Sequence, residues 1–184
     1  LNKVKIDVKS SFTNKSGTQI ISRKKIKNIN IIRGVSFTKN DAKVSLLGVK
    51  DKPGVAAAIF EPLYKNSINV DMVVQNISSD GKETDLTFTI KSDDLLKTKK
   101  LISKNKKIRF KKLVVDKNVS KVSIVGVGMI TTPGVTYRMF QALANKKINI
   151  LVISTSEIKI SVLIQNKNLK KSVELLHKEF NLNR

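Results

Sequence analysis

The sequence lacks cysteine and has a single histidine, His177, among its 184 residues. Disulfide bonds, thiol nucleophiles and zinc sites built on cysteine are therefore excluded. A Ser-His-Asp triad or a site with several histidine ligands has almost no residues to draw on. We accordingly expect this chain to carry no catalytic residue and no metal site.

Long apolar segments are also missing. No run approaches the roughly 18 residues of a membrane-spanning helix, and residues 1–5 show no apolar signal-peptide core. We therefore expect a cytoplasmic protein without a membrane partner. Hydrophobic residues make up 40% and charged residues 27% of the chain, which indicates a folded protein. Because the first residue is Leu1 and not Met, we expect a fragment of a longer chain.

Acidic residues are few. There are 14 Asp and Glu against 36 Lys and Arg, so the formal net charge is +22. Such a charge favours a polyanionic partner such as nucleic acid. However, only five of these cations are Arg, and Lys, Asn and Ile share A/T-rich codons, so base composition alone produces the same mixture. The densest cluster, from Lys97 to Lys112, contains no acid, and either a solvated surface or an anionic partner accounts for it.

Two segments of the chain repeat each other. Residues 44–76 match residues 122–156, and Pro53-Gly54 in the first copy corresponds to Pro133-Gly134 in the second. In each copy an apolar strand leads into the Pro-Gly loop, and apolar residues then recur at helical spacing. Two further strands and a second helix follow. In the first copy the segment 108–115 adds a last strand, which completes the β-α-β-β-α-β order of ferredoxin-like domains.

The second copy ends without its sixth element, and the segment 31–37 is a strand without a partner. We therefore predict an α+β protein with two tandem ferredoxin-like units, in which segment 31–37 completes the second sheet and the first unit is inserted within the second. The expected domains are residues 40–117 for the first unit and residues 28–39 plus 118–184 for the second. Residues 1–27, with a turn at 14–17, are expected to be a hairpin from another domain.

The two loop-to-helix junctions, residues 51–56 and 131–136, are the candidate binding sites. A helix start offers unpaired N–H groups that donate hydrogen bonds to a carboxylate, and Gly54 and Gly134 allow close approach to the backbone. We expect the next strand, at Asn69 or Asn149, to begin beside the junction and to hold an ammonium group. That arrangement would bind a zwitterion, although an ordinary capped helix turn needs the same Pro and Gly.

Other functions have weaker support in the sequence. Phosphoryl transfer lacks the GxxxxGK[ST] loop, so a free-standing enzyme is not expected. RNA-recognition modules of similar fold stack bases on aromatic residues of the sheet, and here the central strand carries only Phe88. A basic nucleic-acid-binding domain that uses the 97–112 cluster stays open as the alternative function.

At these residues the sequence resembles the C-terminal regulatory region of aspartate kinase (aspartokinase), which carries tandem ACT domains. The resemblance covers about residues 31–184, and residues 10–20 resemble the end of the kinase domain. The matching strings are GVKDKPGVAAAIFEPL, INVDMVVQNIS, KVSIVGVGMITTPGVTYRMFQAL, ISTSEIKISVLI and LHKEFNL.

The resemblance implies a regulatory chain that binds lysine and/or threonine at ACT–ACT interfaces. The effector would control the ATP-dependent phosphorylation of L-aspartate in lysine, threonine and methionine biosynthesis. ATP and Mg²⁺ would belong to a kinase domain or alpha subunit outside this chain, and no cofactor is expected within it. The ACT units would also pair into a homodimer.

The family pattern implies two groups of effector-binding residues. The first comprises Asp51, Gly54, Val55, Ala56, Asn69, Val70, Asp71, Gln75 and Asn76. The second comprises Val135, Thr136, Asn149, Ile150, Ser156 and Glu157. The second loop lacks the Asp-Lys of the first, so we expect the site at residues 51–56 to be the better one.

Overall fold

The computed structural model describes residues 6–20, 31–77, 81–130 and 132–182. Parts of the predicted terminal segment 1–27, and residues 28–30 of the predicted second unit, lie outside these ranges. Within the described residues the chain forms four α-helices, α1 (Val55–Lys65), α2 (Leu95–Lys104), α3 (Val135–Asn145) and α4 (Leu169–Glu179). Its strands are β1 (Ile6–Val8), β2 (Thr18–Ile20), β3 (Gly34–Lys50), β4 (Val73–Ile77), β5 (Glu83–Lys91), β6 (Lys112–Val125), β7 (Val152–Ser156) and β8 (Lys159–Gln165).

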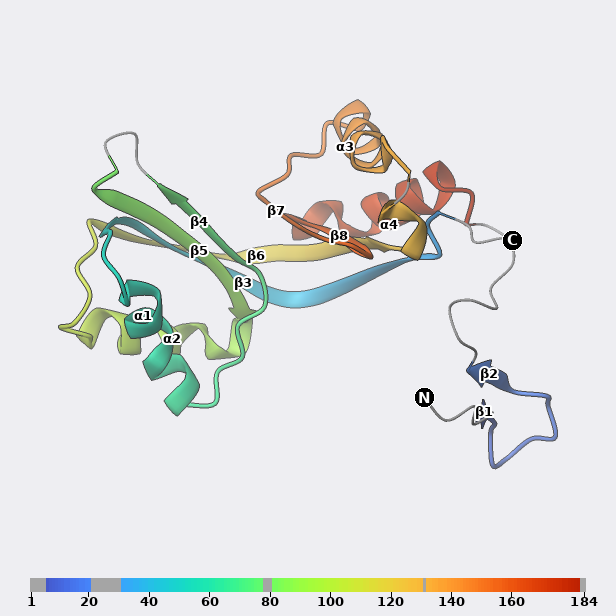
Figure 1. The fold of residues 1–184 in the computed structure, drawn as a ribbon, viewed down its shortest axis with the longest axis horizontal. Helices are drawn as coiled ribbons and strands as arrows, with labels where there is room; N and C mark the ends of the chain where they lie inside the picture. The colour runs from blue at the N-terminus through green and yellow to red at the C-terminus, as the bar shows by residue number, and fades with distance from the viewer. Residues whose placement is uncertain (1–5, 21–30, 78–80, 131, 183–184) are drawn as a thin grey trace.

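Six strands form one antiparallel sheet in the order β4-β5-β3-β6-β8-β7. The long strands β3 and β6 run through its centre, with the first repeat at one end and the second at the other (Figure 1). Strands β4, β5 and the adjoining halves of β3 and β6 make the first ferredoxin-like unit. Strands β7, β8 and the other halves of β6 and β3 make the second.

The strand that completes the second unit comes from upstream of the first. Residues 34–38 of β3 pair with residues 121–125 of β6, while residues 43–47 of β3 pair with residues 112–116. The α+β fold with the first unit inserted in the second is therefore confirmed.

One prediction about the strands was wrong, because segments 31–37 and 44–49 were expected to be separate. The structure joins them into β3, and it likewise joins 112–115 to 122–125 in β6. Residues 35–47 and 112–125 contain no Gly or Pro, the residues that most strongly favour a turn, so each strand continues without a break. The polar stretch in the middle is accommodated by bulges instead, where Asn40 takes a positive φ of 65°.

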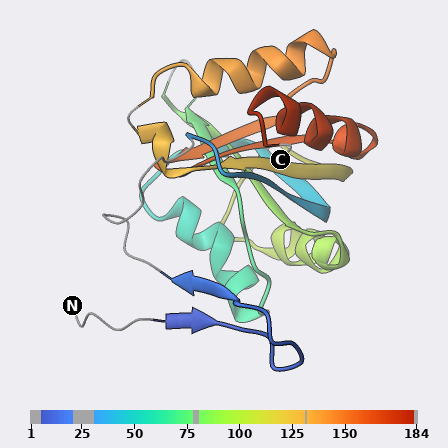
Figure 2. The same cartoon turned by 90° about the vertical axis from the view of Figure 1, so that its right-hand side faces the viewer.

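These bulges decide which face each half of β3 presents. Val35 and Val44 are an odd number of residues apart, which in a regular strand would put them on opposite faces. The register shifts around Asp41 insert one extra residue into each strand of the pair. With one extra residue in β3, Val35 and Val44 face the same side of the sheet strand by strand. Val44 packs under α1 and α2, and Val35 packs with α3 and α4. The sheet twists strongly between its halves, so the two helix layers lie on opposite sides in Figure 2.

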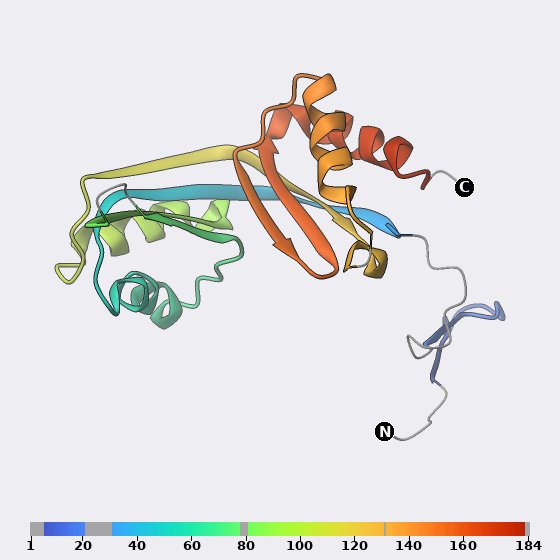
Figure 3. The same ribbon diagram turned by 45° about the horizontal axis from the view of Figure 1, so that its top comes forward.

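Each unit has its own apolar core between its helices and its half of the sheet. Phe88 is fully buried in the first core and meets Phe60 edge to face at 5.3 Å. Met139 and Leu143 occupy the second core, together with Ile32 from the segment before β3. A smaller third cluster of Met72, Val119, Val152 and Leu163 joins the helix-free faces of the two units. We call this contact the seam; in Figure 3 it lies where β4 approaches the β7–β8 hairpin.

The N-terminal part of the described chain is a separate two-stranded hairpin. β1 pairs with β2 in antiparallel register, from Ile6 opposite Ile20 to Val8 opposite Thr18. The predicted hairpin is therefore present, with Gly17 at a positive φ of 75° in its loop. None of the helices in the described residues is long and apolar enough to cross a membrane.

Candidate effector and anion sites

The two helix starts have the same geometry. Gly54 precedes α1 with a φ of 85°, and Gly134 precedes α3 with a φ of 89°. In the described part of the chain, neither start is capped by a side chain, and no atom lies within 4 Å of the place where a glycine Cβ would stand. The backbone at both starts is therefore open to a ligand, as the repeated Pro-Gly motif predicts.

The start of the next strand does not lie beside this junction. The Asp51 N–H donates to the Lys82 carbonyl at 3.0 Å, whereas the Asp71 N–H donates to the Thr89 carbonyl at 3.0 Å. Thr89 is seven residues after Lys82 along an extended strand, which is a distance of about 23 Å. The expected adjacency of carboxylate and ammonium positions within one unit was therefore wrong. The helix must run back along the sheet before the next strand begins, so its start and that strand's start lie at opposite ends.

The second unit shows the same separation. The Gly126 N–H, just before the second loop, donates to the Ile158 carbonyl at 2.9 Å. At the other end of the unit the Leu151 N–H donates to the Leu163 carbonyl at 2.8 Å. Asn149 and Ile150 therefore lie away from Val135 and Thr136.

Each predicted group is thus divided between the two ends of its unit. At the helix-start ends lie Asp51, Gly54, Val55 and Ala56 with Asn76 in the first unit, and Val135 and Thr136 with Ser156 and Glu157 in the second. Gln75 pairs with Leu86 midway along β5 and belongs to neither end. At the strand-start ends lie Asn69, Val70 and Asp71, and in the second unit Asn149 and Ile150.

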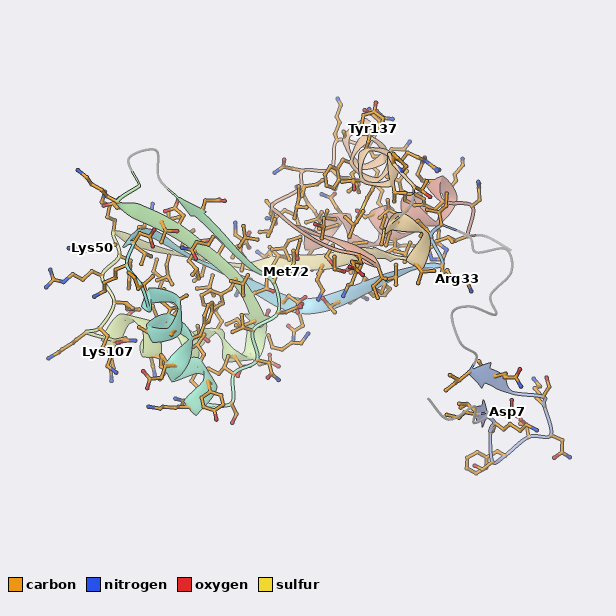
Figure 4. All side chains as sticks on the ribbon, in the orientation of Figure 1. Asp7, Arg33, Lys50, Met72, Lys107 and Tyr137 are labelled. Atoms are coloured by element: carbon orange, nitrogen blue, oxygen red, sulfur yellow. The ribbon has the colours of Figure 1, made fainter. Side chains whose placement is uncertain are left out.

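Residues from the two groups do meet at the seam. Asp71 and Ser156 line a polar hollow of about 110 Å³ between the units. Met72, which also lines it, lies between the two units in Figure 4. Lys121 of β6 reaches into this hollow and forms an ion pair with Asp71. The Ser123 and Ser161 hydroxyls, on the same helix-free face, are hydrogen-bonded at 2.8 Å.

Sequence reasoning missed Lys121. Its side chain is only 10% exposed, an unusual position for lysine. The available signal was its place within Val119–Val125, an otherwise apolar and serine-containing strand with no other charge. A lone ammonium in such a strand indicates a buried partner, which the structure identifies as Asp71.

An apolar groove of about 560 Å³ lies along the outer side of the first unit, between α1 and the edge strand β4. Tyr64 and Val73, which line it, are 82% and 47% exposed. Ile153 occupies the position equivalent to Val73 on β7, the other edge of the sheet, and is 43% exposed. Both edges therefore present an apolar side chain on a strand that, within the described sheet, has a neighbour on one side only.

The basic cluster of residues 97–112 borders two hollows on the first unit. One, of about 460 Å³, lies between α1 and α2 and is lined by five lysines, Glu61 and neighbouring residues. Lys65 and Lys107 donate to Glu61 at 2.7 and 3.4 Å, and these hydrogen bonds hold the pKa of Glu61 below its ordinary value near 4.5. The other hollow, of about 420 Å³, lies at the start of α1.

Comparison with known proteins accounts for the repeat. A family model described as an ACT domain matches residues 44–105 and 122–180. The crystal structure of aspartokinase alpha and beta subunits contains a chain that is 40% identical, with a TM-score of 0.74, over 82% of this chain and 99% of that one. The chain belongs to the aspartokinase family of ACT-domain proteins.

Other members of the family agree. The ligand-free regulatory subunit of aspartate kinase from Thermus thermophilus is 33% identical, with a TM-score of 0.75, over 82% of this chain and 99% of that one. Aspartokinase from Helicobacter pylori (strain ATCC 700392 / 26695) is 45% identical over 183 residues, which are 97% of this chain but 45% of the relative. The chain thus spans less than half of that relative and corresponds to the aspartokinase regulatory region.

Membership of this family does not favour the nucleic-acid alternative. Phe88 of β5, the aromatic residue that the sequence singled out for stacking on a base, is fully buried beneath α1. Phe37 of β3 is 48% exposed, and the Lys39 ammonium lies 5.8 Å from the centre of its ring. Among the described residues, the hollow at the start of α1 has no aromatic lining residue. Stacking, on which sequence-tolerant recognition of single strands relies, therefore has no platform at Phe88 or in this hollow.

Proposed function

We propose that this chain is the amino-acid-sensing regulatory part of an aspartate kinase. It binds lysine and/or threonine and thereby controls the ATP-dependent phosphorylation of L-aspartate, in the cytoplasm, by a catalytic domain or alpha subunit. The observation that carries the proposal is the pair of open, uncapped helix starts at Gly54 and Gly134, repeated in two units of a regulatory-subunit fold.

The divided groups of residues favour binding between two copies of the chain. A helix start can hold the effector's carboxylate, but within one unit the strand start lies about 23 Å away. A second copy that pairs along an edge strand would bring its own strand start to this helix start. The exposed Val73 and Ile153 on β4 and β7 support such a homodimer, because open edges are commonly covered by pairing.

Inhibition would then be a coupling free energy between the ACT units and the kinase domain. An effector that binds one arrangement of the units more tightly, by roughly 1–3 kcal/mol, shifts the population towards that arrangement. Strands β3 and β6 belong to both units. A change in strand pairing in one unit would therefore shift the backbone of the same two strands in the other unit.

Isothermal titration of the chain with L-lysine and then with L-threonine, at moderate salt, tests the proposal. We expect saturable heat with at least one of them and a loss of about tenfold in affinity in Asp71→Asn, which removes the carboxylate at the strand start that would hold the ammonium. The matched control is Asp7→Asn on the separate hairpin, which should bind as the wild type does. Absence of saturable heat with both amino acids, in the chain alone and in the chain joined to its catalytic partner, would overturn the proposal.

A further inference from the structure

Five cationic side chains converge on the hollow at the start of α1. Its lining consists of Lys50, Lys52, Val55, Lys106, Lys107 and Arg109, in a volume of about 420 Å³. Figure 4 shows Lys50 and Lys107 at the same outer end of the first unit. Among the described residues, Lys107 alone of the five has a carboxylate within 4.0 Å, that of Glu61. The hollow therefore carries a large uncompensated positive charge.

The walls of this hollow are held in place by hydrogen bonds that do not involve the cationic groups. The Lys50 N–H donates to the Arg109 carbonyl at 3.3 Å, which ties the end of β3 to the segment before β6. The Asn105 side chain donates to the Ala58 carbonyl at 2.9 Å and accepts from the Lys107 N–H at 3.0 Å. This fixes the 105–107 turn against α1. The cations are thus brought together by the fold and not by their own mutual interactions.

Such convergence is unfavourable unless an anion is bound. Like charges that share a concave surface repel one another, and the surrounding protein focuses their field into the hollow. A single carboxylate, such as that of an amino acid, would neutralise one of the four charges that remain besides Lys107, which already pairs with Glu61. A chain of phosphate groups carries several charges and many acceptor oxygens, which lysine and especially arginine bind through charge-assisted hydrogen bonds.

We propose that this hollow is a binding site for a small polyphosphate anion, in addition to the amino-acid site of the proposed function. The ligand is either an inorganic polyphosphate or the triphosphate group of a nucleotide, and both present the same chemistry. The site lies next to the proposed carboxylate position and shares Val55 with it. A bound phosphate chain would therefore be linked to effector binding at the same helix start.

Titration calorimetry with tripolyphosphate and with ATP, without Mg²⁺ and at about 150 mM salt where nonspecific adsorption is reduced, tests this site. We expect one saturable site per chain and comparable affinities for both compounds. The double variant Lys106→Gln/Arg109→Gln should weaken both by about tenfold or more. The control is Lys170→Gln/Lys178→Gln, which removes the same charge from α4 of the second unit and should change affinity less than twofold.

A thermal readout separates a binding role from a structural one. Because the cations repel one another, Lys106→Gln/Arg109→Gln should raise the melting temperature of the free chain while reducing the stabilisation that tripolyphosphate confers. Residues needed only for folding would lower it instead. Equal weakening in both double variants, or binding of ATP but not of tripolyphosphate, would overturn the proposal. Tighter binding of a short single-stranded oligonucleotide through the same two residues would replace it with a nucleic-acid site.

Failure of this site and failure of the proposed function are distinguishable, because the amino-acid titration uses different ligands. A chain that binds lysine or threonine but shows no saturable heat with tripolyphosphate retains the regulatory proposal and loses only the polyphosphate site.

Discussion

Asp71 and Lys121 form an ion pair across the seam between the two units. Asp71 lies just before β4 of the first unit, and Lys121 lies on β6, where that strand belongs to the second. The two side chains are unequally buried, since Asp71 is 55% exposed and Lys121 only 10%. The ammonium therefore depends on the carboxylate more than the carboxylate depends on the ammonium.

This asymmetry predicts unequal effects of removing either partner. Asp71→Asn leaves a buried ammonium without its counter-ion and should lower the free energy of unfolding by about 1–3 kcal/mol. Lys121→Met replaces the ammonium with an apolar group of similar length next to Met72 and should cost less than about 1 kcal/mol. Urea unfolding of both variants measures the difference. A larger loss for Lys121→Met than for Asp71→Asn would contradict the assignment.

A second prediction concerns the strand that completes the second unit. A Cβ added at Gly126 would stand 2.1 Å from the Ile31 carbonyl oxygen and 2.7 Å from the Ile32 Cα. Both are backbone atoms that cannot move aside without displacing the segment before β3. Gly126→Ala should therefore cost roughly 2–3 kcal/mol, in the range of overpacked cores.

The matched control for this prediction is Gly34→Ala. No atom lies within 4 Å of the Cβ position there among the described residues, so the substitution should be tolerated. Hydrogen exchange would locate the damage of Gly126→Ala, with protection lost in α3 and α4 before α1 and α2. Equal stability of the two alanine variants would mean that the upstream segment does not pack against the second unit.

The repeat made much of this fold predictable. Pro53-Gly54 and Pro133-Gly134 mark helix starts that the structure has at Val55 and Val135, because glycine adopts the left-handed backbone just before the helix without a steric penalty. Counting elements in the two copies was enough to predict the insertion. These signals are local or periodic, so they are visible in the sequence.

The continuous strands and the seam were not predictable in the same way. Asn40 and Asp41 resemble a linker, but Asp41 is buried and bonded to Lys91 at 2.9 Å, a partner 50 residues away. The position of Asp71 likewise depends on Lys121, also 50 residues away. The expected zwitterion site failed for a related reason, since proximity in the sequence across a helix corresponds to opposite ends of the sheet.

A third prediction follows from Glu61. Its pKa is lowered by hydrogen bonds from Lys65 and Lys107, so the folded state holds the charged carboxylate more strongly than the unfolded state does. Its contribution to stability is present above pH 4.5 and is lost as the pH falls through the lowered pKa. Glu61→Gln should be less stable than the wild type at pH ~6, and the difference should shrink as the pH falls through the lowered pKa.

Glu61 also links stability to the proposed polyphosphate site. Glu61→Gln releases Lys107 from its carboxylate, so tripolyphosphate should bind the variant more tightly at neutral pH. Glu174→Gln removes an acid whose ion pair with Lys170 spans 4.0 Å on the second unit, and it serves as the control for net charge. An equal gain of affinity in both variants would show that only the total charge matters.

The last prediction concerns the edges of the sheet. Charged residues on an edge strand oppose pairing with another chain, because an ammonium group would be buried against the partner. In the proposed homodimer, Val73→Lys and Ile153→Lys should each raise the dissociation constant by about tenfold or more, measured by sedimentation equilibrium. Leu96→Lys on α2 is the control, since Leu96 is 73% exposed but lies away from both edges. If the wild type sediments as a monomer at ~100 µM, or if Leu96→Lys disrupts the dimer as strongly as the edge variants do, the edges are not the interface. The effector would then have to bind within one chain, and the seam hollow around Asp71 and Ser156 is where its described residues from both groups already meet.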